Sequence, residues 1–203
     1  MKPFNWINHV EPAKGPPPPN TFGFLLWSLS GSFKILSLSG FLSILTGITE
    51  VSAVLLLGLL IDAALNSTVE DPLSNNILLF SAGLLFFLLI RPIIFGSSSY
   101  MQSVIVSPNI FNLVLSRIHR WCIGHSILFF ENDFAGRIAQ KEMQTARAVT
   151  DVVVEILQTV LFALASVIGA ALMLTSVNIT LTFALLFWLV CYFFLIRYFM
   201  PII

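Results

Sequence analysis

The sequence predicts an all-α membrane protein with four transmembrane helices and long extensions beyond the membrane. Hydrophobic residues make up 57% of the 203 residues and charged residues only 10%, whereas soluble domains are about 25% charged. The mean hydropathy is +0.93. Four apolar runs are each long enough to cross a bilayer, and two of them continue into amphipathic stretches that a compact bundle does not need.

Charge and cysteine content narrow the class further. The chain has 10 basic and 10 acidic residues, so its formal net charge is zero and nothing indicates a nucleic-acid partner. Its 2 cysteines, Cys122 and Cys191, are too few for a disulfide framework.

The N-terminal part divides into two segments. Residues 1–20 are polar, end in four prolines and lack the apolar core of a signal peptide, so we expect a disordered or extended cytosolic tail. Residues 21–33 place Phe22, Leu25 and Leu29 at helical spacing. This spacing predicts either an interfacial elbow helix on the inner membrane surface or simply the beginning of the first span.

The four apolar runs each exceed the roughly 20 residues that cross a 30 Å hydrocarbon core. In the third run, small residues at Ala165 and Gly169, and at Ser166 and Ala170, predict a face for close helix packing. The predicted spans cover residues 35–65, 77 to about 97, 152–175 and 179–199.

Charges in the connecting segments predict the orientation of the chain. The loop at 66–76 contains Glu70 and Asp71 but no Lys or Arg, while five basic residues lie in the connection between the second and third spans. The positive-inside rule therefore predicts that both termini and this connection are cytosolic. We expect a multi-pass protein of a bacterial inner membrane.

The second and third runs are too long for the membrane alone. Residues 77–125 measure about 73 Å as a helix and residues 134–175 about 63 Å, so both are predicted to project some 25 to 40 Å into the cytosol. Ile110, Val114, Ile118 and Trp121 share one predicted packing face, and Arg117 lies off it. The two prolines of the first arm, Pro92 and Pro108, are predicted to kink it.

The polar hinge at 125–140 joins these two arms. Asn132 or Asp133 can cap the returning helix. Before them, residues 126–132 combine two aromatic side chains with an acidic residue, which is typical of a short exposed helix that docks into a groove of a partner.

Three blocks of the sequence resemble the N-terminal part of the membrane domain of an ABC exporter of the half-transporter type, with the type IV fold. They are Gly58-Leu-Leu-Ile-Asp62, Ser126-Ile-Leu-Phe-Phe-Glu-Asn-Asp-Phe-Ala-Gly-Arg-Ile138 and Asn178-Ile-Thr-Leu181. The first resembles the end of the first helix of the family, the second its first intracellular loop, and the third the start of its fourth helix, here without the Trp that often precedes it. The resemblance implies that residues 34–203 form a partial exporter membrane domain, with a first intracellular loop at about 106–150.

The resemblance also implies a role for the hinge, namely coupling to an ATPase domain. Gln144-Thr145 departs from the Asn-Asp that many members have at that place, which puts its usual polar contacts in doubt. The residues implied to couple are Ser126, Ile127, Leu128, Phe129, Phe130, Glu131, Asn132, Asp133 and Gly136.

Parts of such an exporter are absent from the sequence. It contains no G-x-x-x-x-G-K-[ST] phosphate loop and no fifth or sixth helix. We expect no cofactor in this chain, and ATP and Mg in the missing ATPase domain. The chain is then either a truncated product or one part of a transporter whose other part is encoded elsewhere.

Two charges inside the predicted membrane spans lie at matching depth. Glu50 and Arg91 are each about 15 residues, or about 22 Å, from the outer ends of their spans. A lone charge there costs at least about 2.5–3.5 kcal/mol, so the two are expected to pair. The pair either fixes packing only or forms a polar spot in a translocation cavity.

A catalytic or metal site is not predicted. His119, His125, Glu131 and Asp133 cluster in sequence, but they lack the H-E-x-x-H arrangement, and a solvated loop explains them better. The expected function is the membrane-spanning part of an ATP-driven exporter, with a second half-transporter, an ATPase domain, membrane lipid and a hydrophobic or amphipathic substrate as partners. The alternative is a non-transporting four-helix scaffold or a defective truncated fragment.

Overall fold

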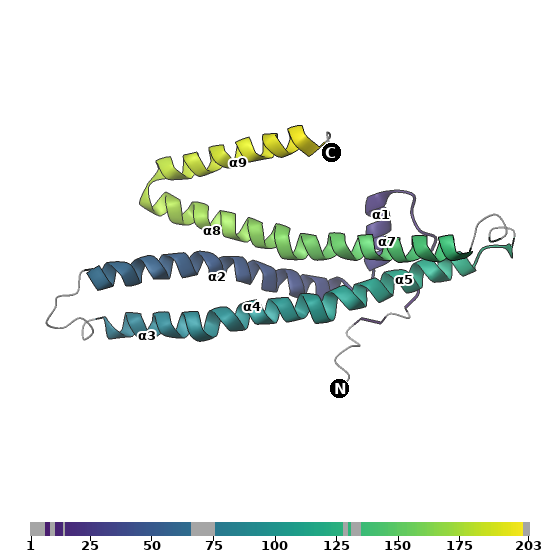
Figure 1. Ribbon diagram of the computed structural model, residues 1–203, viewed down its shortest axis with the longest axis horizontal. Coiled ribbons are helices and arrows are strands. Elements are labelled where there is room, and N and C mark those ends of the chain that lie inside the picture. Colours follow the sequence, from purple (N-terminus) through teal and green to yellow (C-terminus); the bar gives the residue numbers. More distant parts are fainter. Residues whose placement is uncertain are drawn as a thin grey trace.

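The computed structural model describes residues 7–8, 11–13, 15–65, 76–127, 130 and 135–200, and the regular structure in these ranges is all helical. Figure 1 shows long helices lying side by side along one axis. The elements are α1 (Thr21–Leu29), α2 (Phe33–Leu65), α3 (Ile77–Leu85), α4 (Arg91–Tyr100), α5 (Ser107–Ile123), α7 (Ala135–Glu155), α8 (Leu161–Val177) and α9 (Ile179–Phe199).

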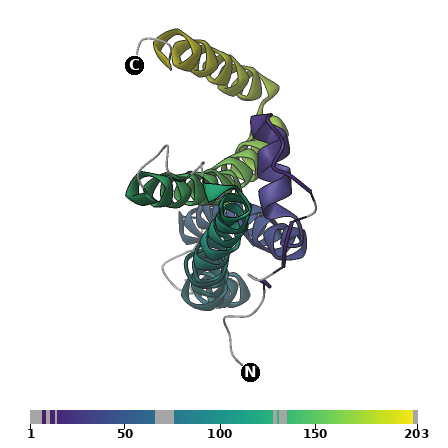
Figure 2. The ribbon, with the colours of Figure 1, turned by 90° about the vertical axis from the view of Figure 1, so that its right-hand side faces the viewer.

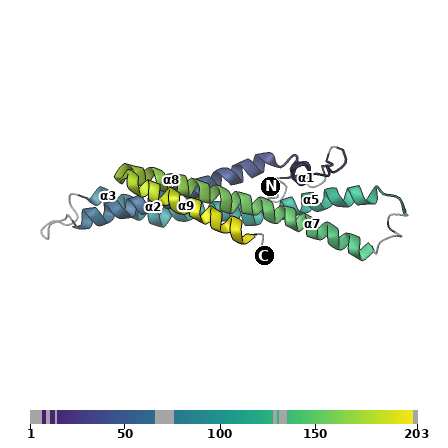
Figure 3. The ribbon, with the colours of Figure 1, turned by 90° about the horizontal axis from the view of Figure 1, so that it is seen from above.

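Four helices are long and apolar enough to cross a membrane, which confirms the predicted number of spans. They are α2, the continuous helix from α3 to α5, the continuous helix from α7 to α8, and α9, with 33, 47, 42 and 21 residues. At 1.5 Å per residue the second is about 70 Å long and the third about 63 Å. Both therefore extend well beyond a 30 Å core, as two arms that run side by side in Figures 1 and 3.

Three π-helical turns interrupt the long helices: Phe86–Ile90, Met101–Val106 and Ile156–Val160. At the end of each, a backbone N–H bonds five residues back, as Arg91 N does to the Phe86 carbonyl oxygen. Pro92 and Pro108 each stand just after one of these turns, at the start of α4 and α5. These are the two prolines predicted to kink the arm. Each lies at a local change from π-helix to α-helix, where the backbone hydrogen bonds already depart from the regular α-helical pattern.

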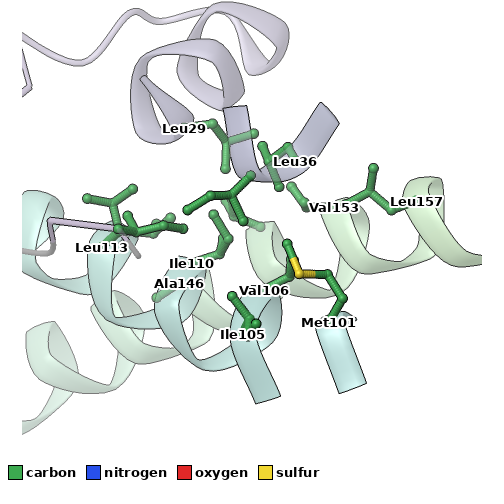
Figure 4. Close-up of a cluster of buried hydrophobic side chains, with 14 residues drawn as sticks. Leu29, Leu36, Met101, Ile105, Val106, Ile110, Leu113, Ala146, Val153 and Leu157 are labelled. Atoms are coloured by element: carbon green, nitrogen blue, oxygen red, sulfur yellow. The ribbon is translucent and has the colours of Figure 1, made fainter. Parts of the chain in front are cut away.

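The hydrophobic core lies at the ends of the first and third predicted spans that adjoin the arms, and in the first part of the arms themselves. Figure 4 shows it between the α1–α2 segment, α5 and α7. Val106, Ile110, Val114 and Ala146 are fully buried there. The predicted face of the first arm is therefore confirmed at Ile110 and Val114, but Trp121 is exposed and instead lies edge-on to a neighbouring histidine ring.

Close packing between α2 and α8 depends on glycine. A methyl group placed on Gly47 would come within 2.8 Å of the Ala165 Cβ and of a backbone oxygen of α8, and one on Gly169 would meet Val51 at 3.0 Å. The backbones approach closely because these side chains are absent. The small-residue face predicted for the third span is thus used against the first.

Before the first span, α1 is a separate helix. It ends at Leu29, and the chain turns at Gly31, whose φ of 86° favours glycine, before α2 begins at Phe33. The break agrees with an elbow rather than a continuous first span, and the place of α1 on a membrane surface stays a prediction. In the described part of the tail, Ile7 is buried against the core instead of being free.

The last helix packs differently from the rest. Asn178 caps α9, its Oδ1 accepting from the Thr180 N–H at 2.9 Å. The side chains of α9 are almost all exposed. The helix contacts α8, and Figure 2 shows it standing apart from the remaining helices.

Candidate functional site

A polar stripe lines the contact between the first two spans. On α2, Ser39, Ser43, Thr46 and Glu50 recur every three or four residues and so occupy one side of the helix. The facing helix runs in the opposite direction and presents its own polar residues in reverse order, from Arg91 at one end through Ser98 to Gln102 at the other. Ser39, Ser43, Thr46, Glu50 and Arg91 lie inside predicted spans, where polar side chains are costly unless they pair or face a cavity, and this makes the stripe the candidate site.

The charged end of the stripe is an ion pair. Arg91 Nη2 lies 3.0 Å from Glu50 Oε2 and 3.2 Å from Oε1, so one nitrogen contacts both carboxylate oxygens. The Arg91 guanidinium also lies over the Phe95 ring, 5.6 Å from its centroid. The contact expected from equal depth is therefore present. Its role in a cavity stays a prediction, and the two side chains are partly exposed, at 38% and 39%.

The uncharged end of the stripe opens into a cavity of about 510 Å³. Three helices contribute to it: α2, the second span at α4 and its π-helical turn, and the third span at its own π-helical turn. Such turns occur frequently at functional sites. The lining residues are Ser43, Thr46, Phe95, Ser98, Ser99, Gln102, Gln158, Thr159 and Phe162.

Gln102 links two of the helices that line this cavity. It is only 3% exposed, and its Nε2 donates to the Ser43 hydroxyl at 2.9 Å. Ser43 in turn donates to the Ser39 carbonyl oxygen at 3.1 Å. Two buried atoms, Gln102 Oε1 and Ser39 Oγ, have no hydrogen-bond partner within the described part of the chain. The site residues predicted from the sequence did not include these three, although polar residues at helical spacing within an apolar run were a visible signal.

A second polar centre lies on the first arm, at Arg117. Its guanidinium donates to the Ser28 carbonyl at 2.8 Å, the Ser30 carbonyl at 2.8 Å and the Trp27 carbonyl at 3.1 Å. It also donates to the Ser30 hydroxyl at 3.0 Å and to the Glu11 carbonyl at 3.3 Å. The prediction that Arg117 lies off the packed face is wrong, because this side chain is 4% exposed and fastens the end of α1 to the arm.

Further along the arms, α5 and α7 are joined by a polar contact. His119 Nδ1 lies 3.0 Å from Glu142 Oε2. Cys122 lies about 68 Å along the helix from Ile77, beyond the reach of a 30 Å core. Burial, together with a hydrogen bond to Glu142 and its negative charge, raises the pKa of the Cys122 thiol to about 11. Among the described residues, no three metal-ligating side chains come together.

The residues predicted to couple to an ATPase domain are described only in part. Ser126 is exposed, and Ile127 is 77% exposed at the tip of the first arm. Gly136 and Gln144 line the same cavity, of about 430 Å³, between the arms. Gln144 is one of the two residues that depart from the Asn-Asp of many family members. Outside the described residues lie Leu128, Phe129, Glu131, Asn132 and Asp133, including both predicted helix caps.

Comparison with known proteins gives two matches. The family described as the ABC transporter transmembrane region matches residues 36–203. An uncharacterized ABC transporter ATP-binding protein of Haemophilus influenzae is 25% identical over 99% of this chain and 32% of its own length. The chain thus spans about a third of the curated relative that it matches. No solved structure matches it.

Proposed function

Because the chain belongs to the ABC transporter transmembrane region family, we propose that it forms the first four membrane helices of an ATP-driven exporter. The observation that carries this proposal is the pair of continuous helices of 47 and 42 residues. Each extends some 30 to 40 Å beyond a 30 Å core, and the two pack against each other through α5 and α7. A non-transporting bundle has no use for such arms, whereas a transporter needs them to carry motion to its cavity.

The energy source in this proposal is an ATPase domain that binds ATP and Mg. The relative from Haemophilus influenzae is named as an ATP-binding protein, and this chain matches about a third of it. Docking would use the hinge at residues 126–136. The exposed apolar side chain of Ile127 supports this proposal, because contact with a partner would bury it. A second half-transporter would complete the cavity, and the substrate would be hydrophobic or amphipathic.

We propose that the protein lies in the inner membrane of a bacterium. In the proposed orientation both termini and the hinge are cytosolic. Cysteine substitution at Glu70 and at Arg137, followed by labelling of intact cells with an impermeant maleimide, tests it. Residue 70 should react and residue 137 should not. The opposite pattern would overturn the orientation.

The docking role is tested by Phe130→Ala in the protein assembled with its remaining helices and ATPase domain. An aromatic anchor in an interface can contribute 2 kcal/mol or more. ATP hydrolysis should persist, but substrate should no longer stimulate it, and export should fall at least tenfold. Ile123→Ala removes an exposed apolar side chain from the end of the adjacent arm and serves as the control. Full export and stimulation in a well-folded Phe130→Ala protein would favour the scaffold alternative.

A further inference from the structure

The cavity around Gln102 reaches from the inner part of the predicted hydrocarbon core to the level of the lipid head groups on the proposed inner side. Ser43 is 22 residues from the outer end of α2 at Leu65, and Gln102 is 25 residues from Ile77. These separations correspond to depths of about 33 and 37 Å. The hydrocarbon core is about 30 Å thick, so Ser43 and Gln102 lie where the chains of a lipid end and its head group begins.

The lining is rich in hydrogen-bonding groups without charge. It contains five hydroxyls and two carboxamides, and among the described residues that line it none is ionisable. The nearby charges of Glu50 and Arg91 already neutralise each other. A charged head group would therefore lose its hydration here without gaining a counter-charge, whereas hydroxyls can donate to and accept from every polar side chain of the lining.

Gln102 indicates that something is missing from this lining. Its carboxamide is buried and bonded to Ser43 through one atom only, and the other atom, Oε1, has no partner in the described part of the chain. Buried amides are rarely left half-satisfied. The unpartnered oxygen is itself covered by protein atoms, so a ligand hydroxyl reaches the carboxamide only when the Gln102 side chain turns toward the cavity that it lines. The hydroxyl can then donate to the amide oxygen or accept from the amide nitrogen.

Two aromatic rings supply the rest of the site. Phe95 and Phe162 line the same cavity as the hydroxyls, and an aromatic ring can cover the apolar face of a sugar-like ring or the start of an alkyl chain. The volume of about 510 Å³ is within the range of sites for small ligands.

We propose that this cavity binds the uncharged, hydroxyl-bearing head group of an amphiphile, with its alkyl chain directed to the bilayer. The identification of this amphiphile as a cargo rests on the proposed export function. Binding itself does not, so the two can be tested separately.

The test uses the full chain in phosphatidylcholine nanodiscs and an alkyl glucoside that carries a photoreactive diazirine. Labelling should map to the peptides that contain Phe95 and Phe162. It should exceed at least tenfold the labelling by probes of the same chain length with a trimethylammonium or a sulfate head. Excess octyl glucoside should displace the label, and methyl glucoside at the same concentration should not.

Two variants assign the recognition to the cavity. Gln102→Leu keeps the bulk of the side chain but removes its polar atoms, and should lower labelling about tenfold. Gln158→Leu should lower it as well, which keeps the test informative if the first variant folds poorly. Gln140→Leu, on the exposed side of α7, should leave labelling unchanged.

Equal labelling by the charged probes, displacement by methyl glucoside, or full labelling of both well-folded cavity variants would overturn the proposal. In the assembled transporter the outcomes separate. If the protein is labelled but no substrate stimulates its ATP hydrolysis, the export function is contradicted and the binding site is not. A coupled transporter whose cavity is not labelled contradicts the site alone.

Discussion

Replacing Arg117 with methionine should release the elbow from the first arm. Arg117 donates five hydrogen bonds to a segment 87 to 106 residues earlier in the sequence. Methionine has a similar length and can fill the space, but it offers no donor. The change therefore removes the hydrogen bonds while it keeps much of the packing of the core around Val114.

The magnitude follows from which acceptors lose their partner. The Trp27 carbonyl also accepts from the backbone N–H and the hydroxyl of Ser30, so it remains satisfied. The carbonyls of Ser28, which is fully buried, and of Ser30, which is half-buried, lose the donor found in the structure. An orphaned buried acceptor costs about 1–3 kcal/mol, so we expect a total of about 2–4 kcal/mol against docking of the elbow. This corresponds to a roughly 30- to 700-fold rise in the undocked population.

Hydrogen exchange followed by mass spectrometry measures this population directly. Amides of residues 21–36 should exchange faster by about that factor in Arg117→Met, while those of α8 should not change. Arg117→Lys should recover only part of the protection, because an ammonium cannot reach several divergent carbonyls at once. Arg147→Met, at an exposed position on α7, is the control. If exchange of residues 21–36 stays within twofold of the wild type in folded Arg117→Met, the tether does not hold the elbow.

Three more predictions concern the membrane helices and the arms. In a double-mutant cycle, Glu50→Gln or Arg91→Gln alone should lower the yield of folded protein, and the double variant should recover much of it because no orphaned charge remains; a double variant as poor as the worse single one would argue against pairing. Gly47→Ala should cost about 1–3 kcal/mol in unfolding assays because its methyl group meets the backbone of α8, whereas Gly58→Ala, with open space, should not destabilise the protein; equal effects would refute the packing. Alkylation of Cys122 should rise about tenfold per pH unit from pH 8 to 10, since a thiol with a raised pKa is still protonated there, and a plateau near pH 9 would contradict the raised pKa.

The sequence was sufficient to predict the spans and the ion pair because the membrane restricts both. A lipid environment requires runs of about 20 apolar residues, which hydropathy detects, and it penalises a lone charge. Glu50 and Arg91 lie at the same depth on two antiparallel neighbouring helices, so they meet although they are 41 residues apart in sequence. No comparable restriction exists outside the bilayer.

The Arg117 tether and the Gln102 cavity could not be derived in the same way. The acceptors of Arg117 are mostly backbone carbonyls, which every residue has, so no side-chain pattern announces them. Gln102 meets Ser43 across 59 residues of sequence, within a π-helical turn whose position no sequence pattern gives. The sequence offered Pro108 as a hint of irregular helix, but it did not specify the type of irregularity.

The π-helical turn at Met101–Val106 has a consequence for how the gene can vary in length. Such a turn holds about one residue more than the α-helical turn that it replaces, and it accommodates this residue without rotating the helix that follows. Deleting one residue there should convert the turn to regular α-helix and leave Ile110 facing the core and Arg117 facing the elbow. Deleting one residue from the regular helix between these two side chains would instead rotate everything after it by about 100° and turn Arg117 from the elbow. Single-codon deletions should therefore be tolerated in the π-helical turn and rejected in the regular part of α5.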